Sequence, residues 1–228
     1  EFVLGYPNAY GKLSPRPTLP AELDPQHILP VDPEGSGRAD LGMNGSYLVL
    51  RTLRQDVEAF QAYLSSVAPG REDDFAARLV GRWPSGAPLV LSPDADSPEL
   101  GTSNDFDYHE LDPAGFRCPV GAHIRRANPR DSLDPSPGSA ASIETTDRHR
   151  LLRRGRAYGT DGASGDRGLQ FVALNADLSR QFEFVQHSWL NSPKFDGLYD
   201  DRDPIAGARS ADSATFTIQA APLRRRYP

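Results

Sequence analysis

The stretch CPVGAHIRRANPR, residues 118–130, gathers groups that could bind a charged cofactor. It contains His123, three arginines and the only cysteine of a 228-residue chain whose formal net charge is −6. The small residues Gly121 and Ala122 would let a bulky molecule approach the backbone, and the arginines could meet its anionic groups. Haem fits both features, because its iron takes an axial imidazole and its propionates take arginines. The alternative is a surface or hydrogen-bonded histidine.

The composition indicates a globular chain and argues against two classes of partner. With 38% hydrophobic residues, the chain can bury a core of one or two domains. Its 31 acidic and 25 basic residues argue against a general nucleic-acid binder. No apolar run approaches the roughly 18 residues of a membrane-spanning helix, so we expect no membrane partner. The single cysteine permits no internal disulfide, which favours a cytoplasmic location and leaves secretion open.

Two segments change from strand periodicity to helix periodicity and are expected to frame the site. YLVLRTLRQDVEAFQAYL predicts a strand over 46–53, followed by a helix whose apolar face carries Val57, Phe60 and Leu64. LQFVALNADLSRQFEFVQHSWL predicts a strand over 169–174 and a helix with one apolar face, formed by Leu178, Phe182, Val185 and Trp189.

The order of the expected elements predicts the fold class. Further strands are expected in RLLRRGRAYG and ATFTIQA, and a further helix in EDDFAARLVGRW. Strand, helix, strand, strand, helix, strand is the order of an α+β ferredoxin-like (split βαβ) domain, an antiparallel sheet with helices on one face. The other face of the sheet then needs a partner.

The predicted domain organisation has two parts. Residues 1–44 contain seven prolines and are expected to form an extended covering segment, with apolar residues that pack on the chain's own domain. A proline-rich peptide ligand is the alternative. Residues 45–228 are expected to form the ferredoxin-like haem-binding domain, with a long functional excursion at about 84–148.

Several segments together resemble the C-terminal part of the dye-decolourising (DyP-type) haem peroxidases. They are CPVGAHIRRANPRD, RHRLLRRGRAYG and GLQFVALNADLSRQFEFVQHSWLNSPKF, with EFVLGYPNAYG, NGSYLVLRTLRQDVEAF and VGRWPSGAPLVLSP before them. The resemblance runs from Glu1 to about residue 207 in the family's own order. It implies one half of a two-domain peroxidase of the dimeric α+β barrel type, with haem b bound mainly by the C-terminal half.

The resemblance also assigns roles to four residues. It implies that His123 is the axial iron ligand and that Asp203 is the carboxylate hydrogen-bonded to this imidazole. Arg153, in RRGRAYG, corresponds to the distal arginine, which contacts the haem and stabilises the departing peroxide oxygen. Arg130 corresponds to a propionate partner. The implied activity is oxidation of dyes, phenols or other reducing substrates by hydrogen peroxide through a ferryl intermediate.

The chain departs from the family pattern in one respect. The family's proton-relaying aspartate lies in a GxxDG motif before the EFVLGY segment, and the chain contains no GxxDG. We therefore expect a C-terminal portion whose partner is the missing N-terminal half of the same protein. GTDG at 159–162 is expected to be a turn, with Asp161 as the first substitute relay to test. The alternative function is a haem-binding module for storage, transport or sensing.

Other single residues allow weaker hypotheses. Cys118 is a possible thiolate ligand, but a buried, inert thiol is the favoured interpretation. Trp83, Trp189 and Tyr158 are candidate carriers of oxidising equivalents to bulky substrates, and Trp189 is expected to pack in the core because it lies on the apolar helix face.

Overall fold

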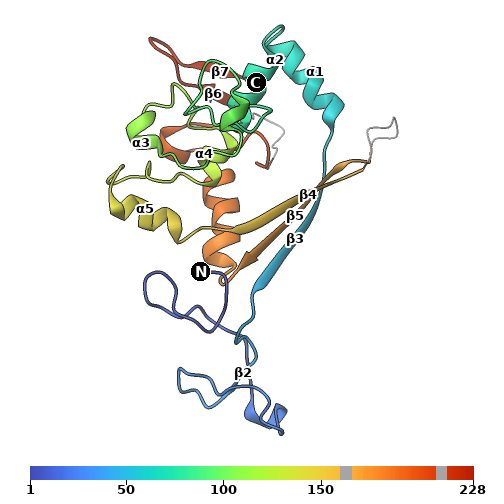
Figure 1. The fold of residues 1–228 in the computed structure, drawn as a ribbon, viewed down its shortest axis with the longest axis vertical. Coiled ribbons are helices and arrows are strands. Elements are labelled where there is room, and N and C mark those ends of the chain that lie inside the picture. The colour runs from blue at the N-terminus through green and yellow to red at the C-terminus, as the bar shows by residue number, and fades with distance from the viewer. Residues whose placement is uncertain (160–165, 209–214) are drawn as a thin grey trace. The chain divides into compact units, whose positions relative to one another are not determined.

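The computed structural model describes residues 1–159, 166–208 and 215–228 (Figure 1). The chain divides into two compact units, and each is built from two segments. Unit 1 comprises residues 1–55 and 150–183, and unit 2 comprises residues 56–149 and 184–228. Residues 1–44 thus belong to the same unit as the sheet, whereas the excursion at 84–148 belongs to unit 2.

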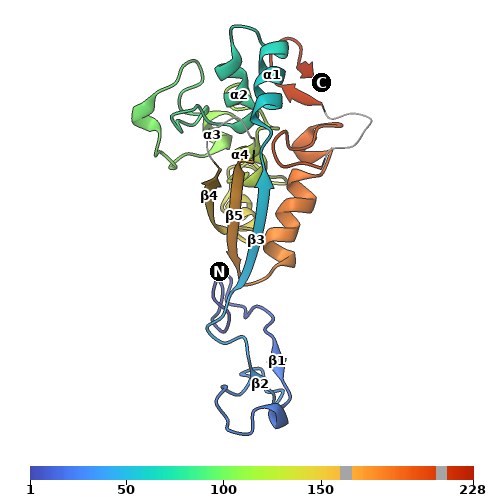
Figure 2. The same ribbon diagram turned by 90° about the vertical axis from the view of Figure 1, so that its right-hand side faces the viewer.

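Unit 1 contains a three-stranded antiparallel sheet (Figure 2). Strand β5 (Gly168–Asn175) lies between β3 (Tyr47–Arg54) and β4 (Leu152–Tyr158). The predicted strands agree with β3 and β5 to within a residue or so. Both contain β-branched and aromatic residues, which favour strands: Tyr47, Val49 and Thr52 in β3, and Phe171 and Val172 in β5.

The element order confirms an α+β ferredoxin-like arrangement, with one difference. Strand, helix, strand, strand, helix, strand runs through β3, α1 (Val57–Val67), β4, β5, the helical segment after β5, and β6. A central β5 that pairs antiparallel with both β3 and β4 is the arrangement expected of a split βαβ sheet. In the described residues, however, β6 (Phe216–Ile218) pairs with β7 (Arg225–Tyr227) in a separate two-stranded ribbon.

The helical segment after β5 has π-helical turns where the sequence predicts an ordinary helix. In η3 (Ser179–Glu183), the N–H of Glu183 donates to the carbonyl of Leu178, five residues back, at 2.8 Å. The fully buried Gln181 accepts from Ala176 N at 2.8 Å and donates to Arg150 O at 2.8 Å. Gln181 thus ties the start of this helical segment to the residue after β5 and to the chain just before β4. The π-helical segment η4 (Val185–Leu190) follows in unit 2.

The proline-rich segment folds on itself instead of remaining only extended. Its short strands β1 (Thr18–Leu19) and β2 (Ala39–Asp40) pair, and η1 (Ala21–Leu23) lies between them. Arg16 is buried and pairs with Asp40 at 2.8 Å and with Asp32 at 3.1 Å. The prediction that the segment's apolar residues pack on the chain's own domain is wrong for Ile28 and Val31, which are 75% and 71% exposed.

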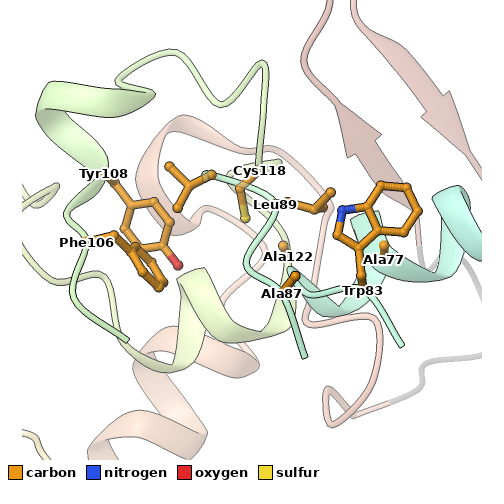
Figure 3. Close-up of a cluster of buried hydrophobic side chains, with 9 residues drawn as sticks. Ala77, Trp83, Ala87, Leu89, Phe106, Tyr108, Cys118 and Ala122 are labelled. Carbon is orange, nitrogen blue, oxygen red and sulfur yellow. The ribbon is translucent and has the colours of Figure 1, made fainter. Parts of the chain in front are cut away.

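Unit 2 is mainly helical and holds three buried apolar clusters. Its elements are α1 (Val57–Val67), α2 (Glu72–Val80), η2 (Pro98–Leu100), α3 (Tyr108–Leu111), α4 (His123–Ala127), α5 (Ala140–Asp147), η4, η5 (Phe195–Gly197), β6 and β7. One cluster surrounds Cys118 with side chains from α2, the loop after it, α3 and the segment before α4 (Figure 3). Within the described ranges, no helix is both long and apolar enough to span a membrane.

Candidate functional site

The central feature of unit 2 is a hydrogen bond between His123 and Asp203. His123 is the first residue of α4, and Asp203 lies 80 positions later in the chain. The distance from His123 Nδ1 to Asp203 Oδ2 is 2.9 Å. The imidazole is 31% exposed, whereas the carboxylate is completely buried. One face of the pair is therefore open, and the other is fixed inside the protein.

Backbone groups hold the Asp203 carboxylate in place. Its Oδ1 atom accepts from the N–H groups of Ile205 at 2.9 Å and Ala206 at 2.6 Å, which leaves Oδ2 for the imidazole. Burial alone would raise the pKa of Asp203, but the hydrogen bond and charge of His123, together with these N–H groups, outweigh burial and hold the pKa below its usual value. The carboxylate is thus an acceptor, and the proton of the pair is on Nδ1.

This arrangement fits an iron ligand. With the proton on Nδ1, the lone pair of Nε2 points away from Asp203, and Nε2 has no hydrogen bond to any residue that the structure describes. Metal-binding histidines commonly donate their other N–H to a carboxylate, which fixes the tautomer and makes the ring more electron-rich. The donor set suits the axial position of haem, for which one imidazole suffices.

Arg125 and Arg126 are buried and bind protein groups, contrary to the expectation that the arginines of residues 118–130 meet a ligand. Arg125 is 1% exposed, and its Nη1 donates to Asp112 Oδ2 at 3.2 Å and to the carbonyl of Cys118 at 3.0 Å. Arg126 is 0% exposed and, among the described residues, donates only to backbone carbonyls. Both anchor α4, because a buried guanidinium must find acceptors inside the protein.

The small residues before His123 also serve a different purpose from the one expected. A Cβ atom at Gly121 would lie 3.4 Å from the ring of Phe216 and 3.5 Å from Leu198. Ala122 is 0% exposed and lies in the cluster around Cys118. The interpretation that these residues leave room for a ligand is therefore wrong: other side chains of unit 2 pack against them.

Arg130 contacts the loop that precedes α3. Its Nη1 donates to the carbonyls of Asn104 at 3.1 Å and Phe106 at 2.6 Å, and its Nη2 donates to the Asn104 side chain at 2.8 Å. The guanidinium lies 3.8 Å from the centre of the Phe106 ring. These contacts leave Nε–H and one Nη2 proton without a described partner, so a propionate contact stays a prediction.

Arg153 lies in unit 1, on strand β4. Its side chain is exposed and has no hydrogen bond or ion pair to a described residue. In the register of the sheet, it lies opposite Ala173, which is 0% exposed. Its position in the sheet is thus known, and its role stays a prediction.

Several other predicted residues are placed by the structure, and one lies outside it. Cys118 is fully buried, in keeping with an inert thiol. Trp189 is 6% exposed and lies in a core cluster, as expected. Trp83 is also buried, and its indole donates to the carbonyl of Ser92 at 2.7 Å. Asp161 and most of the GTDG string fall in residues 160–165, outside the described residues.

Sequence reasoning missed the structural roles of Arg125 and Arg126 and the turn that holds Asp203. The turn did have a signal: in DPIAG, an aspartate before Pro-x-x-Gly is typical of a turn in which the carboxylate accepts from the following N–H groups. Arg126 had no comparable signal, because its acceptors are carbonyls from distant segments of the chain. Arg125 had none either, because the sequence does not show that Asp112 and Cys118 lie beside it.

Comparison with known proteins identifies similar chains. No family model matches this sequence. A dye-decolorizing peroxidase of Mycena epipterygia is 35% identical over 206 residues, which cover 77% of this chain and 37% of that protein. The chain thus spans well under half the length of this relative.

Solved structures give the same result. A DyP-type peroxidase of Anabaena sp. has a TM-score of 0.70 and 29% identity, over 80% of this chain and 40% of that one. A dye-decolorizing peroxidase in complex with 2,6-dimethoxyphenol has a TM-score of 0.64 and 31% identity, over 80% of this chain and 46% of that one. Over the part of the protein that it spans, this chain therefore belongs to the dye-decolorizing (DyP-type) peroxidase family.

Proposed function

We propose that this chain is the haem-binding part of a peroxidase that uses hydrogen peroxide to oxidise dyes, phenols or other reducing small molecules. The observation that carries the proposal is the His123–Asp203 pair, in which a buried carboxylate lies 2.9 Å from Nδ1 and the imidazole is partly exposed. A solved relative forms a complex with 2,6-dimethoxyphenol, which supports phenols as one class of reducing substrate.

His123 and Asp203 form the proximal side in this proposal. His123 would bind the iron of haem b through Nε2, and the haem, when bound, would supply the redox chemistry with peroxide. Asp203 accepts a hydrogen bond from the Nδ1–H group of His123 and thereby makes the imidazole a stronger electron donor. An electron-rich axial ligand favours cleavage of the O–O bond.

Arg153 is the proposed distal arginine. Heterolysis of hydrogen peroxide leaves negative charge on the departing oxygen, and a fixed guanidinium stabilises that charge without reorganisation. Two observations support Arg153: its side chain is exposed without a described partner, and the residue opposite it in the sheet is the small Ala173. Arg130 would contribute its two free N–H groups to a haem propionate.

The proposed partner is the N-terminal half of the same protein, which would carry the proton-relaying aspartate of GxxDG. One face of the sheet in unit 1 supports this proposal. Leu48 and Leu152 both lie opposite Leu174, and Leu50 lies opposite Val172 on the same face. Leu48, Leu50 and Leu152 are 59%, 60% and 52% exposed. An exposed apolar face of this kind is suited to cover by another sheet.

The proposal is tested with His123→Ala in the chain together with its N-terminal half, and His187→Ala is the matched control. His187 is an exposed histidine on η4. We expect His123→Ala to lose the absorption band of bound ferric haem and peroxide-dependent oxidation of 2,6-dimethoxyphenol, and His187→Ala to keep both. Unchanged haem binding in His123→Ala would reject the ligand assignment. A wild-type protein that binds haem but does not oxidise phenols would instead support the haem-binding module.

A further inference from the structure

Arg126 is a fully buried cation that binds only backbone carbonyls among the described residues. It lies three residues after His123 on the same helix. Its Nε donates to the carbonyl of Trp189 at 2.9 Å, its Nη2 to Trp189 at 2.5 Å and Ser192 at 2.6 Å, and its Nη1 to Asp201 at 3.1 Å. Its guanidinium also lies 4.8 Å from the centre of the Phe195 ring.

These carbonyls belong to the two segments that determine where Asp203 lies. Trp189 is in the last turn of η4, and Asp201 precedes Asp203 by two residues. The N–H of Asp203 itself donates to the carbonyl of Leu190 at 2.8 Å, so Arg126 and Asp203 bind the same helix end. The C-terminal end of a helix has carbonyls without partners inside the helix, and it carries a partial negative charge. A buried cation donates to these carbonyls and offsets that charge.

Arg126 also keeps its charge in this environment. Burial lowers the pKa of Arg126 to about 10, against the opposing effect of Asp203 and Asp201. A pKa of about 10 leaves the guanidinium protonated at neutral pH, so all of its N–H groups remain donors.

His123 and Arg126 connect α4 to the segment 201–203 through two separate hydrogen bonds. Residues three apart on a helix lie on the same side, so His123 and Arg126 both reach the segment 201–203 from α4. Because α4 has only five residues, its own hydrogen bonds do not fix its orientation. We infer that Arg126 is a positioning residue, which clamps the end of η4 and the backbone of Asp201 and thereby holds the Asp203 carboxylate against Nδ1 of His123.

Arg125 provides a matched control for this inference, which rests on the proposed haem ligation. It is the neighbouring residue and is equally buried, and like Arg126 it donates to backbone carbonyls, in its case together with one carboxylate. Its partners, however, are Asp112 and Cys118, which lie on the chain before α4 and share no hydrogen bond with Asp203 in the part of the chain that the structure describes. Loss of either arginine should destabilise the protein, but only loss of Arg126 should loosen the bond between Asp203 and the imidazole.

The experiment compares Arg126→Lys, Arg125→Lys and Asp203→Asn in the haem-loaded chain with its N-terminal half. The readouts are the iron–histidine stretching band of the ferrous protein, its reduction potential, and thermal unfolding of the haem-free protein. We expect Arg126→Lys to shift the band and the potential towards those of Asp203→Asn, with roughly tenfold weaker haem binding. We expect Arg125→Lys to lower the unfolding temperature without shifting the iron–histidine band or the reduction potential.

A wild-type band and potential in Arg126→Lys would overturn the inference, and so would equal shifts in Arg125→Lys. If Arg126→Lys does not fold, Phe195→Leu removes the ring beside the guanidinium and keeps every charge. It should give a smaller shift in the same direction, and a wild-type band there would also reject the positioning role. Failure of the haem ligation itself is distinguishable, because His123→Ala would then retain the haem spectrum.

Discussion

Gly81 packs so closely on Ile124 that a Cβ atom at Gly81 would lie 2.4 Å from Cγ1 of Ile124. Gly81 ends α2 with a φ of 95°, in the left-handed region that favours glycine. Ile124 directly follows His123 in α4. The end of α2 therefore supports the helix that carries the imidazole, and only a residue without a side chain permits this contact.

Gly81→Ala should consequently destabilise the protein and weaken haem binding. We expect a loss of about 2 kcal/mol in the free energy of unfolding, from overpacking and backbone strain together. Gly70→Ala is the control, because Gly70 has a φ of 77° but no atom within 4 Å of the added Cβ. Urea unfolding measures the loss of stability in both variants. The loss in Gly70→Ala reports backbone strain alone, and the additional loss in Gly81→Ala reports the clash with Ile124. Equal losses in the two variants would show that the contact with Ile124 is unimportant.

The buried thiol of Cys118 should make the stability of the protein depend on pH at alkaline values. Burial raises the pKa of Cys118 to about 12, from 9.0 for an exposed thiol. The unfolded chain thus loses this proton at lower pH than the folded chain does. The contribution of the thiol to stability is fully present below pH 9 and is lost as the pH rises towards 12.

The measurement is urea unfolding of the wild type and of Cys118→Ala at several pH values above 9. We expect the free energy of unfolding to fall more steeply with pH in the wild type. Alkylation of Cys118 in the folded protein should also be slow at about pH 8, because the thiolate is the reactive form. Rapid alkylation of the folded protein would show that the thiol is accessible.

Arg153 and Arg154 should behave differently, because neighbouring residues of a strand project to opposite faces of the sheet. Arg153 lies opposite Ala173. Arg154 lies opposite Val172, which in turn lies opposite Leu50 on the exposed apolar face. In the chain with its N-terminal half, Arg153→Leu should slow the first reaction with hydrogen peroxide roughly 100-fold to 1,000-fold while haem content stays near normal. Arg154→Leu should leave this rate close to the wild-type value. Stopped-flow absorption tests both, and the reverse result would assign the distal role to Arg154.

The local elements of this chain could be predicted from sequence because their determinants are local. The predicted strand over 46–53 is observed as Tyr47–Arg54, and the helix that begins at Val57 is observed as α1. The side chain of Asp56 accepts from Ala59 N at 3.0 Å and so caps that helix. The π-helical form of η3 could not be predicted, because apolar periodicity shows which face of a helix is buried and not whether its hydrogen bonds span four residues or five.

The site could be predicted only in part, because its contacts join residues that are far apart in the sequence. A family resemblance pointed to His123 and Asp203, which lie 80 positions apart and are 2.9 Å from each other in the structure. The burial of Arg126 depends on carbonyls 63 or more positions away, and adjacent arginines in a sequence look the same whether buried or exposed. The small residues before His123 likewise indicated the approach of a bulky molecule, but the sequence could not show that protein side chains occupy the space.

The exposed apolar face of the sheet should make the isolated chain dependent on the proposed N-terminal half. Leu48, Leu50 and Leu152 are each more than half exposed, and apolar patches on this scale favour association. We expect the chain alone to aggregate and to turn over phenols about 100-fold to 10,000-fold more slowly than the two halves together, since it lacks the GxxDG proton relay. Light scattering and peroxidase assays, with and without a co-expressed segment carrying GxxDG, measure both effects.

The double variant Leu48→Lys/Leu50→Lys tests whether the N-terminal half must dock on the apolar sheet face before it can provide the proton relay. It should reduce aggregation of the chain alone, because charge replaces the apolar surface, yet it should also prevent activation by the N-terminal half, because two lysines cannot be buried against a partner sheet. Activation that survives this change would place the contact elsewhere. If the purified chain instead matches the activity of both halves together, a carboxylate within it performs the relay, and Asp161, outside the described residues, becomes the first to replace.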